Sequence, residues 1–221
     1  DVLIKGVGAH GASPHRGVDP VLLGSQIVTA LQTVVSRTLP PRRPGVITVG
    51  SFHSGTKHNI ISDAAKLQLT VRSESREDRQ LLLDGIRRVA ENMGRVAGLP
   101  DDMLPEVIVY EDESVPATLN DTELTESIRD VWTERFGGKV FFEEPRLGMG
   151  AEDFPFFTTE PYIPSVYFAV GGTPPEAFER EAKGGEPVPS HHSPLFKVEP
   201  EPSVKLGVEA SVAALMHLLQ P

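Results

Sequence analysis

The order of hydrophobic patterns over residues 1–115 most constrains what this chain can fold into. A short apolar strand pattern at 2–7 precedes a helical pattern that starts at Pro20, and two strand patterns follow. A second helical pattern and a last strand pattern, at 107–110, complete the series. The order is therefore β-α-β-β-α-β, which is typical of a ferredoxin-like α+β domain.

Local signals support these elements. Asp19 followed by Pro20 predicts a helix start, because Asp accepts a hydrogen bond from free backbone N–H groups and Pro needs none. Apolar residues alternate with polar ones over 67–72, which predicts a half-buried strand. Residues 75–78 resemble a capping box at the start of the second helix.

The second half of the chain predicts a different layout. We expect a helix that starts at an Asn120 cap, a closing helix over 204–219, and short strands at 140–142 and 163–170. Two strands are too few to bury a sheet. This half is therefore expected to be the C-terminal part of a larger α/β domain.

The two halves of the chain differ in charge, and the net charge of the whole chain argues against some classes of protein. Residues 1–115 carry 13 basic and 14 acidic side chains, whereas 116–221 carry 8 and 17. The composition changes at a polar stretch, 111–116, that reads as a linker. A net charge of −10 without a basic stripe argues against a nucleic-acid partner, and no run is apolar enough for a membrane helix. The chain has no cysteine, which is compatible with the cytoplasm.

Two candidate site motifs lie in the first half. His10 stands in a run of small residues that lets a ligand approach, so its ring could stabilise an oxyanion; a surface histidine is the plain alternative. Asn59 and Arg72 could hold a substrate carboxylate, with Arg as a bidentate donor. Otherwise Asn59 caps a loop and Arg72 lies on a solvated strand face.

Two further motifs lie in the second half. Glu152 and Asp153 follow Gly-Met-Gly-Ala; Glu152 could orient a metal-binding histidine, or the pair could complement a helix dipole. His191 and His192 precede Ser-Pro in a loop and could include a metal ligand or be surface residues.

Together these motifs resemble the dinuclear-zinc amidohydrolase and peptidase family, which includes aminoacylase, carboxypeptidase G, hippurate hydrolase and the indoleacetyl-amino-acid hydrolases. The matching segments run through most of the chain: GVGAHGASPHRGVDPV, LQTVVSRTLP, HNIISD, GMGAEDF and HHSPLF. The family's α/β zinc domain is interrupted by a ferredoxin-like lid that dimerises. The resemblance implies that residues 1–115 are this lid and that 116–221 are the C-terminal part of the catalytic domain.

The resemblance also implies roles for single residues. The family histidine that reaches the neighbouring subunit's active site and polarises the scissile carbonyl falls on His10. The substrate-carboxylate residues fall on Asn59 and Arg72, and the last metal ligand falls on His192. Glu152 and Asp153 match an acidic pair near the active site.

The family places most zinc ligands and a catalytic Glu pair before the lid. The 221 residues are therefore expected to belong to a longer enzyme and to be inactive in isolation. The implied reaction is hydrolysis of the amide bond in N-acyl amino acids or small peptides, with two zinc ions per intact subunit, or manganese or cobalt. The implied partner is a second copy bound through the lid. A non-catalytic dimerisation module and a small-ligand-binding module remain alternatives.

Overall fold

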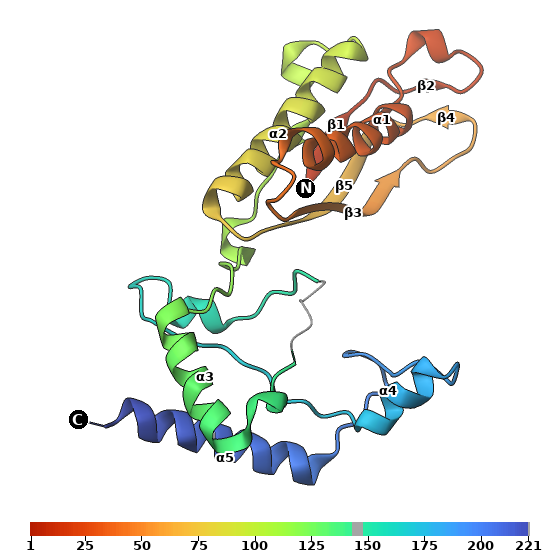
Figure 1. Ribbon diagram of the computed structural model, residues 1–221. Coiled ribbons are helices and arrows are strands. Elements are labelled where there is room, and N and C mark those ends of the chain that lie inside the picture. Colours follow the sequence, from red (N-terminus) through yellow and green to blue (C-terminus); the bar gives the residue numbers. More distant parts are fainter. Residues whose placement is uncertain (143–147, 221) are drawn as a thin grey trace. The chain divides into compact units, whose positions relative to one another are not determined.

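A computed structural model describes residues 1–142 and 148–220 of the chain. The chain forms two compact units (Figure 1). One comprises Asp1–Thr118 and a short segment that ends at Pro155, and the other comprises the rest. The predicted domain boundary between residues 115 and 116 stays a prediction.

The first unit is built on a four-stranded antiparallel sheet with the strand order β3-β5-β1-β6. This order, with one helix after the first strand and another after the third, is the ferredoxin-like arrangement that the sequence predicted. The last strand is shorter than predicted and ends at Val107, although the Ile108 N–H still bonds to the Asp1 carbonyl oxygen at 3.0 Å. The four strands are β1 (Val2–Lys5), β3 (Gly45–Ser54), β5 (Ala64–Ser73) and β6 (Glu106–Val107).

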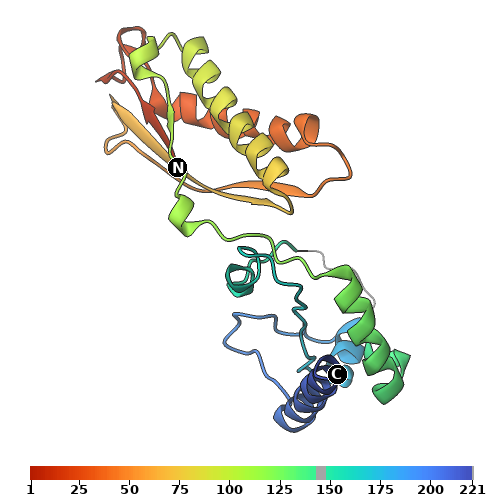
Figure 2. The ribbon, with the colours of Figure 1, turned by 90° about the vertical axis from the view of Figure 1, so that its left-hand side faces the viewer.

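Two helices cover one face of this sheet, as Figure 2 shows, and leave the other face open. They are α1 (Pro20–Thr33), which a π-helical turn continues to Thr38, and α2 (Arg76–Val96). Between them and the sheet lies the hydrophobic core. Its most buried side chains are Val2, Ile4, Leu23, Ile27, Leu31, Val34, Leu67 and Leu82.

Both predicted helix starts are confirmed. The Asp19 carboxylate accepts a hydrogen bond from the Val21 N–H at 2.8 Å, and the Ser75 hydroxyl oxygen accepts one from the Asp78 N–H at 3.0 Å. Asp78 is buried, and its Oδ1 lies 3.1 Å from the Arg43 guanidinium, so its charge is compensated.

Helices α1 and α2 approach closely because α2 carries Gly85 at the crossing. A Cβ on Gly85 would lie 2.4 Å from a methyl carbon of Val34, which is fully buried. A β-branched side chain in a filled core cannot move aside without displacing its neighbours. Only glycine therefore fits at this position without displacing its neighbours.

We expect Gly85→Ala to destabilise the first unit by about 1–3 kcal/mol, because overpacking outweighs the gain of about 1 kcal/mol in helix propensity. Urea denaturation followed by circular dichroism measures the change. Val34→Ala should make room, so the double variant should lose less than the sum of the two single losses. A more stable Gly85→Ala protein would refute this account of the crossing.

The second unit contains α3 (Thr122–Phe136), α4 (Pro175–Ala182) and α5 (Pro200–Leu218). Helices α3 and α5 enclose a small core in which the Trp132 indole N–H donates to the Ala210 carbonyl oxygen at 2.9 Å. Much of α5 exposes apolar side chains, including Val208 and Leu215. Within residues 1–142 and 148–220, no helix combines the length and apolar character needed to cross a bilayer.

Two strand predictions for this unit were wrong. Residues 138–140 form a 3₁₀ turn, and 163–170 form neither strand nor helix. A strand needs a neighbouring strand that forms hydrogen bonds with its N–H and C=O groups. In the part of this unit that the structure describes, no neighbouring strand is present, so apolar sequence alone did not produce a ladder.

Asn120 does not cap α3 as predicted, because the cap is the next residue, Asp121, which accepts from the Leu124 N–H at 2.9 Å. Asn120 instead clamps Tyr167: its side-chain oxygen accepts from the Tyr167 N–H at 2.8 Å, and its side-chain nitrogen donates to the Tyr167 carbonyl oxygen at 3.0 Å. A side-chain amide thus replaces the missing strand partner. The Tyr162 hydroxyl donates to Asp121 at 2.6 Å.

Hydrogen bonds from Tyr162 and then from the Leu124 N–H hold the pKa of Asp121 below its ordinary value. A lowered carboxyl pKa stabilises the fold above the unfolded-state pKa, and this contribution is lost as pH falls through the folded-state pKa. We expect Tyr162→Phe to raise the Asp121 pKa toward its ordinary value, as measured by NMR titration of its side-chain carbon. An unchanged titration would show that Tyr162 does not act on this carboxylate.

Candidate functional site

His10 and Asn59 come together at a small two-stranded sheet beside the main sheet. Its strands, β2 (Ala9–His10) and β4 (Ile60–Ile61), pair antiparallel, with His10 opposite Ile60. The Gly11 N–H then donates to the Asn59 carbonyl oxygen at 2.8 Å. Both predicted site residues are exposed at the same end of this β2–β4 ladder.

The small residues around His10 have a steric explanation. A Cβ on Gly11 would lie 3.0 Å from the Asn59 carbonyl oxygen, and one on Gly17 would lie 2.4 Å from the Val7 carbonyl oxygen. Glycine therefore lets the loop close tightly on both neighbours. The prediction that small residues permit close approach is confirmed for backbone contacts.

The His10 ring is held at one of its two nitrogens. Its Nδ1 accepts a hydrogen bond from the Ala12 N–H at 3.0 Å. The Ser13 N–H closes the turn by donating to the His10 carbonyl oxygen at 2.7 Å. Sequence reasoning did not identify Ala12, because Ala12 contacts the ring through its backbone N–H. The residue type does not reveal such a contact.

Arg72 lies far from the β2–β4 ladder in the same chain. It is next to the last residue of β5, opposite Val46 of β3, and it is half-buried on the sheet face that the helices leave open. Ala64, at the end of β5 that follows β4, is separated from Arg72 by about 26 Å of strand at roughly 3.3 Å per residue. Asn59 and Arg72 of the same chain therefore lie too far apart to bind the same carboxylate.

His192 adopts an unusual backbone conformation. Its φ angle is +67°, and it is the only non-glycine residue with a positive φ among those the structure describes. It lies in an exposed turn in which the Ser193 N–H donates to the Ser190 carbonyl oxygen at 3.2 Å. Its neighbour His191 instead contacts Phe196 edge-on, with ring centroids 5.1 Å apart. Left-handed conformations cost a non-glycine residue energy, although histidine adopts them more often than most residue types.

Glu152 and Asp153 are exposed and lie just before a 3₁₀ turn over Phe154–Phe157. Their segment belongs to the first compact unit, whereas His192 belongs to the second. In the described part of the chain, no three His, Asp or Glu side chains are grouped to hold a metal ion. The predicted roles of Glu152, Asp153 and His192 beside a metal stay predictions.

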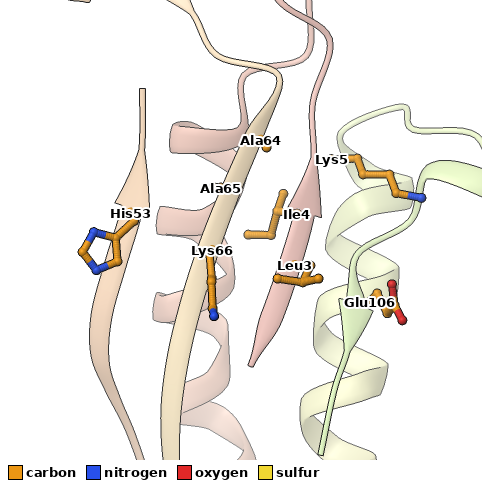
Figure 3. Close-up of a pocket in the computed structure, with 8 residues that line it drawn as sticks. All are labelled: Leu3, Ile4, Lys5, His53, Ala64, Ala65, Lys66 and Glu106. Atoms are coloured by element: carbon orange, nitrogen blue, oxygen red, sulfur yellow. The ribbon is translucent and has the colours of Figure 1, made fainter. Parts of the chain in front are cut away.

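A shallow pocket of about 360 Å³ lies on the open face of the sheet, as Figure 3 shows. It lies between β3, β5, β1 and β6, and none of the predicted site residues lines it. Lys66 at this pocket already pairs with the Asp1 carboxylate at 2.7 Å, and the Lys5 ammonium donates to the Asp102 carbonyl oxygen at 3.3 Å. The Asp1 carboxylate therefore compensates the charge of Lys66, whereas the neutral Asp102 carbonyl leaves the positive charge of Lys5 in place.

Comparison with known proteins identifies the first unit. Residues 1–96 match the family model of the peptidase dimerisation domain, M20_dimer. Residues 1–96 are an M20 peptidase dimerisation domain, and the chain as a whole resembles M20 family enzymes. The matched region contains both strands of the β2–β4 ladder, Arg72 and both helices of the first unit.

Curated M20 relatives extend the match beyond the dimerisation domain. Thermostable carboxypeptidase 1 of Saccharolobus solfataricus is 32% identical over 218 residues, which cover 99% of this chain and 49% of the relative. Hippurate hydrolase of Campylobacter jejuni is 31% identical over 154 residues, which cover 70% of this chain and 39% of the relative. The chain thus spans about half the length of these relatives, or less.

Solved structures show the same fold. A candidate aminohydrolase from methicillin-resistant Staphylococcus aureus superposes with a TM-score of 0.75 at 28% identity, over 98% of this chain and 50% of that one. YXEP of Bacillus subtilis, described as a dinuclear metal-binding peptidase from the M20 family, gives a TM-score of 0.65 at 22% identity. It is matched over 99% of this chain and 51% of its own. The α+β fold predicted from the sequence is confirmed.

Proposed function

We propose that the whole protein hydrolyses the amide bond of N-acyl amino acids or small peptides, at a site shared between two copies of the chain. The observation that carries this proposal is the distance between the candidate residues. His10 and Asn59 lie near the first residue of β5, and Arg72 lies near its last residue. The names of the relatives, a carboxypeptidase and a hippurate hydrolase, support the substrate class.

Each proposed group is available for a ligand. Among the described residues, the Asn59 side-chain amide makes no hydrogen bond and Arg72 has no carboxylate partner; the exposed His10 ring uses only Nδ1. Arg72 of one chain would hold the substrate carboxylate, which guanidinium binds in bidentate fashion. The partner's His10 and Asn59 would donate to the same bound substrate from the other side.

His10 would act on the scissile amide. As water adds to the carbonyl carbon, the carbonyl oxygen gains negative charge, and an N–H aimed at it lowers the energy of that state. The bond to nitrogen then breaks, which gives a carboxylic acid and the free amino group. Positioning by Arg72 and Asn59 would keep the carbonyl within reach of the ring.

Zinc remains the proposed metal, with His192 as one ligand. The residues described here do not form a complete site, since a zinc ion in a protein takes three or four ligands. No step is therefore assigned to a metal. The cytoplasmic location suggested by the lack of cysteine stays a proposal, as does the inactivity of the isolated chain.

The proposed homodimer would form through the long free edge of the sheet. Strand β3 is an edge strand of ten residues, whereas the opposite edge, β6, has two. An edge strand presents unpaired N–H and C=O groups that a second copy can bind. Helix α1, whose Gly24 receives the Phe52 ring of β3, exposes Val21 and Leu22. A two-fold axis through this interface would bring the same groups of both copies into contact.

We expect the chain to elute as a dimer, at twice its 24.0 kDa mass, in size-exclusion chromatography with light scattering. Leu22→Glu should shift it toward monomer, because the leucine is 58% exposed and a charge there is costly to bury at an interface. Leu119→Glu is the matched control, since Leu119 is 64% exposed and lies in the second unit. A monomeric unaltered chain would argue against the dimer.

The shared site has a sharper test in the whole enzyme. His10→Ala and Arg72→Ala should each lower turnover of an N-acyl amino acid such as hippurate by about 100-fold or more, with metal content unchanged. Co-expression of the two variants should restore about a quarter of the activity. Half of the dimers are then mixed, and each mixed dimer has one site with both residues intact.

Residues acting within one chain would give the opposite result, because every site in a mixed dimer would then lack one group. No recovery on co-expression would therefore overturn the shared site while leaving the hydrolase proposal standing. Full activity of both single variants would remove these residues from the reaction.

A further inference from the structure

We propose that the backbone N–H of Ala12 is a positioning group that keeps the proton of the neutral His10 ring on Nε2. The Ala12 nitrogen lies 3.0 Å from His10 Nδ1 and donates to it. A ring nitrogen that accepts an N–H must carry a lone pair, so the proton of the neutral ring lies on the other nitrogen. The catalytic meaning of this assignment rests on the proposed function, but the assignment itself does not.

The donor is fixed in place by the turn around it. The Ser13 N–H closes the turn on the His10 carbonyl oxygen at 2.7 Å, and the Gly11 N–H ties it to Asn59 at 2.8 Å. A Cβ on Gly11 would lie within 3.2 Å of three Asn59 backbone atoms, so only glycine allows this attachment without displacement. The Ala12 N–H is therefore held toward the ring by contacts on both sides.

The chemical consequence is a choice between donor and acceptor. With the proton on Nε2, the ring presents an N–H on the side away from the turn and can stabilise an oxyanion. With the proton on Nδ1, the ring would present a lone pair to the developing negative charge and would repel it. A neutral hydrogen bond of ordinary strength biases the two forms by about fivefold.

The direct test is ¹⁵N NMR of the full chain with labelled histidine, at about pH 8.5, where an ordinary imidazole is neutral. His10 resonances are identified by their loss in His10→Gln. We expect Nε2 at the protonated position, Nδ1 at the unprotonated position, and a scalar coupling across the hydrogen bond between the Ala12 nitrogen and Nδ1.

Replacement of Ala12 by L-lactic acid removes only the N–H, because an ester oxygen takes its place. We expect the coupling to disappear and the proportion of the Nδ1–H form to rise about fivefold. Lactic acid at Ala9, which leaves the Ala12 N–H intact, is the matched control and should change neither. In the whole enzyme, the Ala12 ester should lower kcat more than it raises KM.

A dominant Nδ1–H form in the unaltered chain would overturn the proposal. An unchanged ratio of the two forms in the Ala12 ester would overturn it as well. Neither NMR result depends on turnover, so failure of this proposal can be told apart from failure of the proposed hydrolase activity.

Discussion

Burial of one face of the four-stranded sheet beneath α1 and α2 is the constraint on which the first unit depends. Leu67 at the centre of β5, Ile4 of β1 and Leu82 of α2 are all essentially inaccessible to water. Because the side chains of a strand alternate between faces, committing Leu67, Leu69 and Val71 to the core commits Arg72 to the open face. The position of the proposed carboxylate-binding residue thus follows from how the core packs.

The same packing leaves the β2–β4 ladder at the side of the sheet, where the proposed dimer would use it. Strands β2 and β4 contribute little to the core, and their pairing depends on hydrogen bonds and on close contacts at glycine. Close contacts and hydrogen bonds, more than burial, fix the conformation of these segments. His10 and Asn59 can therefore be exposed and still be held in defined positions.

The second unit shows what happens when an apolar sequence lacks a partner. Residues 163–170 have the composition of a buried strand, yet they form no strand and are held by the Asn120 amide and by the Asp121 N–H bond to Ser165. Apolar side chains along α5 remain exposed. Hydrophobic sequence provides the tendency to pair, and the neighbouring elements decide whether pairing occurs.

The sequence by itself determined the element order of the first unit, both of its helix starts and the residue types of the candidate site. Those features depend on local periodicity, on capping groups and on glycine, all of which can be read along the chain. Only the tertiary structure decided that Asn59 accompanies His10 while Arg72 lies at the far end of β5, and that the Ala12 N–H faces the His10 ring. These are relations between distant residues or backbone atoms, and strand register and turn closure fix them in three dimensions.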